Sequence, residues 1–133
     1  IFGKRALLAE DNAVNAEVFQ GFLKAVHVEV ECVDNGEAAL HAIEYAGYYY
    51  DMIFMDLNMP IMDGYEAAKS IRGSEKPDAS DIPILAALQM DGKGIVKVHE
   101  AGMNERITKP VQRELLYQTM EKYICKKGQG AHL

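Results

Sequence analysis

Short apolar segments alternate with segments of helical periodicity along this chain, and that alternation constrains the fold more than any other feature. We expect strands at residues 5–9, 27–33, 48–56, 82–88 and 105–108, and helices at residues 14–26, 38–47, 64–72, 93–101 and 111–125. Strict alternation with apolar central strands is typical of a parallel sheet that helices cover on both faces. Because crossover connections are right-handed, we expect a doubly wound α/β fold with a five-stranded parallel sheet in the order 2-1-3-4-5.

The composition fits one globular domain in a reducing compartment. The 133 residues suffice for one core, and the apolar share of 49% with a charged share of 26% excludes disorder. A net charge of −6 argues against a nucleic-acid binder, since phosphate contacts need clustered Lys and Arg. The two cysteines, Cys32 and Cys125, cannot form a disulfide framework, and we expect both to be buried or half-buried.

The two ends of the chain are typical of a piece of a longer protein. The chain opens on Ile1 without a Met. We find no signal peptide and no apolar run of membrane-spanning length, so we expect no membrane contact. We expect residues 1–126 to form the domain and residues 127–133 to be a linker or an added tail.

Asp56 is a lone carboxylate at the end of the most apolar predicted strand. Turn-forming residues follow it at once, among them Asn58 and Pro60. In the order 2-1-3-4-5 the first and third strands end side by side, so the acidic pair Glu10-Asp11 should fall beside Asp56. Ligands of α/β proteins bind at this edge of the sheet. The sequence therefore predicts an acidic functional site there.

Three carboxylates at one edge repel each other unless a cation neutralises them. Mg²⁺ prefers oxygen ligands and takes one or two carboxylates directly while it keeps several waters. We expect Asp11 and Asp56 to be direct ligands, Asn58 to offer its backbone carbonyl, and Glu10 to act through water. Taken alone, Glu10-Asp11 could be a plain helix cap and Asp56 a turn residue. Both alternatives weaken if the carboxylates converge.

Lys109 directly follows a predicted strand and precedes Pro110, which disfavours helical backbone at the lysine. It could therefore reach across the sheet edge to Asp56 as a compact positive charge. The alternative is a solvated lysine at the start of a helix, with Pro110 in the first turn. A cation near a helix N-terminus is mildly unfavourable, which favours a specific role.

Several motifs carry a resemblance to a known family. They span residues 4–125 in family order: Leu7-Leu-Ala-Glu-Asp-Asn12, Asn35-Gly-Glu-Ala-Ala-Leu40, Met55-Asp-Leu-Asn-Met-Pro-Ile-Met-Asp-Gly-Tyr65, Ile82-Pro83-Ile84, Ala101-Gly-Met103 and Lys109-Pro110. With them the chain resembles the receiver domain of two-component response regulators, which has a flavodoxin-like (βα)5 fold. The local sequence around Glu10, Asn15 and Arg72 is most similar to that of receivers of hybrid sensor histidine kinases.

The resemblance implies a phosphorelay function in the cytoplasm. Asp56 would take a phosphoryl group from a phosphohistidine of a histidine kinase or a histidine phosphotransfer domain, with Mg²⁺ and Lys109 neutralising phosphoryl oxygens. In the family the side chain at the position of Asn58 influences hydrolysis of the acyl phosphate. The domain would bind neither nucleic acid nor membrane, and homodimers are possible. Whether the domain is an enzyme stays open, since at most it would catalyse its own phosphorylation and dephosphorylation. It could be one part of a hybrid histidine kinase.

The chain departs from the family at both positions that usually read out the phosphoryl group. A Ser or Thr usually ends the fourth strand, but here counting from Pro83 gives Leu88 and counting from Lys109 gives Ala87. The usual aromatic residue before the lysine is replaced by Arg106. We therefore expect an atypical switch, with a phosphorylation-independent interaction module (a pseudo-receiver) as the alternative.

Two enzyme or cofactor functions on related folds are less well supported. Phosphatases and dehalogenases with an aspartyl nucleophile carry the motif Asp-x-Asp, whereas this chain has Asn58 two residues after Asp56. A cap domain of the kind found in those families does not fit in 133 residues. A flavin site is possible on the fold alone, but no phosphate-cradling loop follows the first predicted strand.

Overall fold

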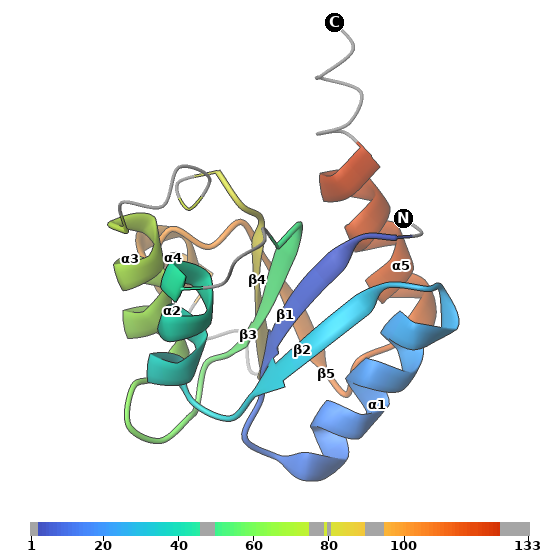
Figure 1. Cartoon of the computed structure of the whole chain (residues 1–133), viewed down its shortest axis with the longest axis horizontal. Coiled ribbons are helices and arrows are strands. Elements are labelled where there is room, and N and C mark those ends of the chain that lie inside the picture. The colour runs from blue at the N-terminus through green and yellow to red at the C-terminus, as the bar shows by residue number, and fades with distance from the viewer. Residues whose placement is uncertain (1–2, 46–49, 75–78, 80, 90–94, 126–133) are drawn as a thin grey trace, which may run out of the picture.

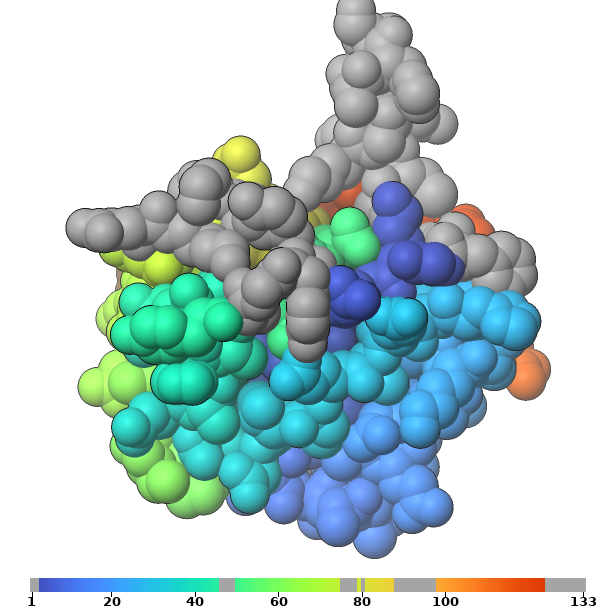
Figure 2. All heavy atoms as spheres, viewed as in Figure 1, coloured from blue at the N-terminus to red at the C-terminus, as the bar shows by residue number. Residues whose placement is uncertain are grey.

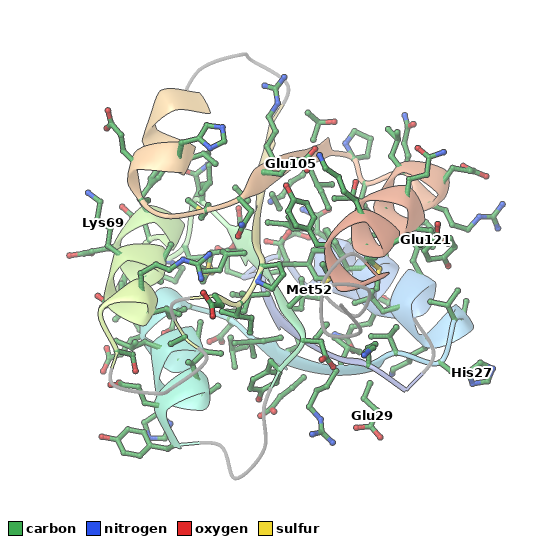
Figure 3. All side chains as sticks on the ribbon, turned by 90° about the horizontal axis from the view of Figure 1, so that it is seen from above. His27, Glu29, Met52, Lys69, Glu105 and Glu121 are labelled. Atoms are coloured by element: carbon green, nitrogen blue, oxygen red, sulfur yellow. The ribbon has the colours of Figure 1, made fainter. Side chains whose placement is uncertain are left out.

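Five parallel strands form one sheet in the order β2-β1-β3-β4-β5, which confirms the predicted topology. The computed structural model describes residues 3–45, 50–74, 79, 81–89 and 95–125. Figure 1 shows the twisted sheet with helices on both of its faces. Seen from above, α2, α3 and α4 form one layer and α1 and α5 the other, and Met52 of the central strand lies between them (Figure 3).

Strands and helices alternate along the chain as predicted. The strands are β1 (Arg5–Ala9), β2 (Glu29–Val33), β3 (Met52–Asp56), β4 (Ile84–Gln89) and β5 (Glu105–Lys109). The helices are α1 (Ala13–Ala25), α2 (Gly36–Tyr45), α3 (Gly64–Arg72), α4 (Ile95–Glu100) and α5 (Arg113–Met120), and α5 continues into a π-helical turn, η1 (Glu121–Cys125). On the face seen in Figure 2, the side chains of α1, β2 and α2 lie side by side.

The sheet separates two apolar cores because successive side chains of a strand point to opposite faces. In β3, Ile53 and Met55 pack into the core beneath α2, α3 and α4, whereas Met52 and Phe54 pack into the core beneath α1 and α5. Every residue of β3 is buried. A strand that is buried on both faces reads as a continuous apolar run, and this run ends at Asp56.

Side-chain caps start three helices just beyond the carboxyl ends of the strands. The Asn12 Oδ1 atom accepts a 2.9 Å hydrogen bond from Asn15 N at the start of α1. The Asn35 and Asp63 side chains accept the equivalent bonds from Ala38 N and Glu66 N, at 2.7 and 2.9 Å. Such caps satisfy backbone N–H groups that have no partner within the helix.

The second strand begins later than the sequence predicted. His27 has a φ of 59° and belongs to the turn after α1, so β2 starts at Glu29 rather than at His27. As predicted, β2 is an edge strand with exposed residues. The prediction that Cys32 is at least half-buried is wrong, because it lies exposed on this edge strand.

Some predicted boundaries fall outside the described residues. These are the start of the third strand at 48–49, the start of the fourth helix at 93–94, and residues 126–133, which include the expected tail. The Cys125 side chain also lies outside them. The last predicted helix begins at Arg113 instead of Val111. None of the helices in the described ranges is long and apolar enough to cross a membrane.

Candidate functional site

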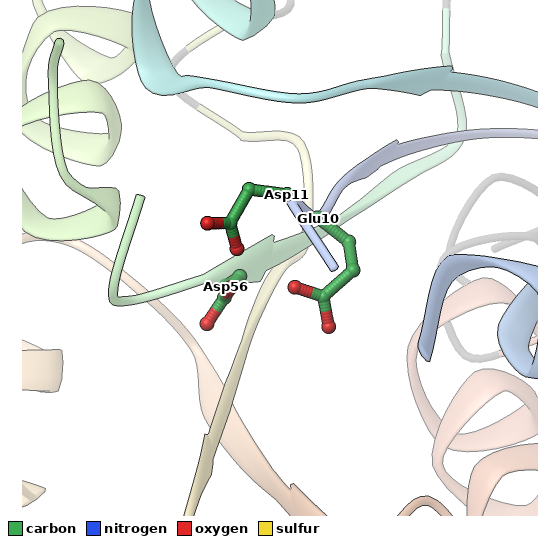
Figure 4. Close-up of side chains that lie close together, drawn as sticks. All are labelled: Glu10, Asp11 and Asp56. Atoms are coloured by element: carbon green, nitrogen blue, oxygen red, sulfur yellow. The ribbon is translucent and has the colours of Figure 1, made fainter. Parts of the chain in front are cut away.

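Three carboxylates converge where β1 and β3 end, as the topology predicted (Figure 4). Ala9 of β1 pairs with Met55 of β3, so Glu10 and Asp11 follow one strand just where Asp56 ends the other. One oxygen of each carboxylate lies within 4.8 Å of the others. Since the side chain of Asn12 caps α1, the carboxylate of Asp11 does not serve as the cap and instead faces the cluster.

Lys109 reaches this cluster from the end of β5. Its Nζ atom donates a 2.9 Å hydrogen bond to Asp56 Oδ1 and lies 3.1 Å from Glu10 Oε1. The three side chains are only 13%, 5% and 1% exposed. The expected contact between Lys109 and Asp56 is therefore present, and Lys109 also forms an ion pair with Glu10.

The electrostatics of the cluster reflect burial and like charge. Burial, and then the neighbouring Glu10, raise the pKa of Asp56, although Lys109 opposes this shift. Desolvation followed by contact with Asp56 raises the pKa of Asp11. Burial lowers the pKa of Lys109, but its hydrogen bond to Asp56 and its ion pair with Glu10 outweigh that effect and the pKa is raised. One ammonium group thus only partly offsets three acids.

The residues present fit a hard divalent cation. Both Glu10 side-chain oxygens are buried without a hydrogen-bond partner, because the 3.1 Å approach of Lys109 lacks hydrogen-bond geometry. A buried carboxylate without such a partner is costly. The three carboxylates supply the oxygen ligands that Mg²⁺ prefers.

The turn after Asp56 is held tightly against the site. The backbone N–H of Asn58 donates a 3.3 Å hydrogen bond to Asp56 Oδ1, and the Gly64 N–H donates a 3.2 Å bond to Leu57 O. A Cβ atom on Gly64 would lie 2.3 Å from the Asp56 carbonyl oxygen. The sequence marked Gly64 only as a turn residue and helix start. The close approach that requires glycine depends on the packing of α3 over β3, for which no local signal exists.

The atypical switch positions lie on β4 and β5. The sheet register pairs Ala87 with Asp56 and Leu88 with Thr108, so Leu88 comes one residue after the position opposite Asp56. The side chain of Leu88 lies outside the described part of the structure. Arg106 pairs with Ala86 and is exposed on β5.

Comparison with known families decides the family of this chain. The model of the response regulator receiver domain matches residues 6–121. The chain belongs to this family. As a receiver domain, it is 34% identical over 127 residues to hybrid signal transduction histidine kinase I of Dictyostelium discoideum, a match that covers 92% of the chain. The receiver spans only 5–15% of the length of such curated relatives.

Solved receiver domains share the fold at 25% identity or more. The receiver domain of the Pseudomonas aeruginosa sensor histidine kinase PA1611, solved with a magnesium ion coordinated in its active site cleft, has a TM-score of 0.83 and 33% identity, covering 92% of this chain and 98% of its own. The Saccharomyces cerevisiae Ssk1 receiver, in a co-crystal with the histidine phosphotransfer protein Ypd1, has a TM-score of 0.83 and 29% identity, covering 96% and 93%.

Proposed function

We propose that this receiver domain accepts a phosphoryl group on Asp56 from the phosphohistidine of a histidine kinase or a histidine phosphotransfer domain. The observation that carries the proposal is the contact of Lys109 with Asp56 inside the acidic cluster, at 2.9 Å. A buried carboxylate held by a cation at a sheet edge is poised to act as a nucleophile and to have its product stabilised.

The transfer conserves atoms and charge. The carboxylate of Asp56 attacks phosphorus, a P–O bond forms, and the P–N bond of the phosphohistidine breaks. The imidazole leaves as a neutral ring when its second nitrogen carries a proton. Lys109 neutralises an oxygen of the transferring group, and the N–H of Asn58 helps to fix the orientation of Asp56.

We assign the metal site to the same cluster. Asp11, Asp56 and the backbone carbonyl of Asn58 would hold Mg²⁺ directly, and Glu10 would act through water. The bound ion would supply further neutralisation of the phosphoryl oxygens. The magnesium ion in the active site cleft of the PA1611 receiver supports this assignment.

The proposed donor is a protein that presents a histidine, because apolar side chains are exposed around the site. On α1, Val14 is 69% exposed and Val18 is 42% exposed, and Ile61 in the turn after β3 is 74% exposed. An apolar rim around a charged centre is typical of a protein-binding surface. The Ssk1 receiver, which binds Ypd1, supports a histidine phosphotransfer domain as the partner.

The readout of phosphorylation is expected to be weak or differently driven. Ala87 places a methyl group opposite Asp56, and neither it nor Leu88 offers a hydroxyl. Amide hydrogen exchange with and without beryllofluoride, a mimic of the phosphoryl group, tests this point. Strong changes in protection across residues 88–108 would contradict it. If Arg106 contacts the phosphoryl group instead, its substitution should shorten the lifetime of that group on Asp56.

Mass spectrometry of the protein after incubation with acetyl phosphate and Mg²⁺ tests the proposed function. The wild type should gain one phosphoryl group, and Asp56→Asn should gain none. Repetition with a phosphorylated histidine phosphotransfer domain tests the donor class. If the wild type takes up no phosphoryl group from either donor, the chain acts as a phosphorylation-independent interaction module.

A further inference from the structure

Arg72, the last residue of α3, joins its helix to the segments that precede β4 and β5. This contact lies at the amino-terminal ends of the strands, away from the acidic cluster. Its guanidinium donates four hydrogen bonds, which go to Gly102 O at 2.8 Å, Ala79 O at 3.0 Å, Ile82 O at 2.7 Å and Asn104 Oδ1 at 2.9 Å. These acceptors lie before β4 and before β5. A planar group with five N–H donors suits such a task, whereas a lysine could not reach all four.

Asn104 links the Arg72 side chain to the first residue of β4. Its Oδ1 atom also accepts a 2.8 Å hydrogen bond from Ile84 N, the first residue of β4. Its backbone N–H donates a 2.8 Å bond to Ile84 O. Asn104 therefore closes a two-bond ring with Ile84 directly before β5 begins at Glu105, which is labelled in Figure 3.

Strand β5 has little apolar burial to define its register. It is an edge strand that pairs only with β4, and Ile107 is its one buried residue. A strand with polar residues on both faces specifies its register weakly. Yet Lys109, at its far end, must meet Asp56 at 2.9 Å.

Gly102 shows how closely the clamp is packed. It has a φ of 89°, and a Cβ atom there would lie 2.8 Å from Arg72 Cγ. The loop between α4 and β5 therefore lies directly on the Arg72 side chain. Glycine satisfies both the left-handed backbone and the close approach.

We infer that Arg72, acting through Asn104, is a positioning residue that fixes the register of β5 and thereby places Lys109 against Asp56. The clamp and the acidic cluster lie at opposite ends of β5, so the effect travels along the strand. The kinetic test of this inference rests on the proposed phosphorylation of Asp56. Its structural test uses the unphosphorylated protein and does not depend on that proposal.

The kinetic test compares Asn104→Ala and Arg72→Met with the wild type in phosphorylation by acetyl phosphate at saturating Mg²⁺. We expect a roughly tenfold slower reaction in each variant, since misplacement by about 1 Å is costly in catalysis. Mg²⁺ affinity should not weaken, because the proposed ligands lie at the carboxyl ends of β1 and β3, not on β5, and the ammonium of Lys109 only repels the cation. General loosening of the fold would weaken both properties together.

The matched control is Lys122→Met. This variant removes the exposed 3.2 Å ion pair between Lys122 and Glu105, the first residue of β5. The hydrogen bonds of Arg72 and Asn104 stay intact. An exposed pair contributes little, so this variant should react at the rate of the wild type. If Arg72→Met does not fold, Asn104→Ala, a change at an exposed residue, carries the test.

Amide exchange in the free protein separates this inference from the proposed function. Both clamp variants should exchange faster than the wild type across residues 105–109, whether or not the protein is ever phosphorylated. Unchanged exchange there overturns the inference, as does a phosphorylation rate within about twofold of the wild type or a loss of rate matched by weaker Mg²⁺ binding. Absence of phosphorylation in the wild type itself would contradict only the proposed function.

Discussion

The Nζ atom of Lys109 lies 2.9 Å from Oδ1 of Asp56, although β4 separates the strands that carry these residues. The contact spans β4 where that strand presents Ala87, which pairs with Asp56 on one side and with Ile107 on the other. The geometry of the site therefore depends on the register of three strands.

Replacing Lys109 should separate chemistry from metal binding. We expect Lys109→Met to slow phosphorylation by about 10²–10³-fold, the cost of losing one preorganised charge. Mg²⁺ affinity should stay the same or increase, because a positive charge leaves the cluster. The rate of phosphorylation by acetyl phosphate measures the first effect, and calorimetric titration with Mg²⁺ measures the second. A variant that loses Mg²⁺ binding as well would show that Lys109 supports the fold of the site instead.

Mg²⁺ should stabilise the folded protein through the three carboxylates. At a concentration about 100 times Kd, bound Mg²⁺ raises the free energy of unfolding by about 2.7 kcal/mol. Urea unfolding with Mg²⁺ and with EDTA measures the difference. Asp11→Asn should remove most of the gain. Asp51→Asn, outside the cluster, should keep it, and an equal loss in both variants would place the metal elsewhere.

Two helical glycines, Gly64 at the start of α3 and Gly21 in the interior of α1, should respond oppositely to alanine. Gly64→Ala should lower the free energy of unfolding by about 1–3 kcal/mol, because the new Cβ would meet Asp56 O at 2.3 Å. Gly21→Ala should raise it by about 0.5–1 kcal/mol, because nothing lies within 4 Å of its Cβ position within α1. Urea unfolding of both variants tests the pair, and equal effects would contradict the close approach of α3 to β3.

Tyr123 should make the fold sensitive to strongly alkaline pH. Burial, and then the hydrogen bond and charge of Glu105, raise the pKa of Tyr123 to about 12 from the 10.0 of the free side chain. The neutral phenol therefore contributes stability that is fully present below pH 10.0 and is lost as the pH rises through about 12. The tyrosinate absorbance of the wild type minus that of Tyr123→Phe reports this titration. A midpoint near 10 would refute the shift.

The sequence predicted the sheet order and the convergence at its edge because both follow from alternation and handedness. Asp56 and Lys109 stood at the ends of recognisable strands, so their meeting could be expected. The late start of β2 could not, since the left-handed backbone of His27 has no clear sequence signal. The Arg72 clamp was equally hidden, because a basic residue in the last helical turn is ordinary and its partner Asn104 lies 32 residues away.

A count of charges gives the cluster a further meaning. With Glu10, Asp11, Asp56 and Lys109 all ionised, three negative groups and one positive group leave two negative charges. A divalent cation brings this sum to neutrality, whereas a monovalent ion leaves an excess that repels any incoming anion. In the proposed metal site, a divalent ion would therefore remove the net repulsion of a dianionic phosphoryl group, and the free Mg²⁺ level of the surroundings would act as a second input beside the donor.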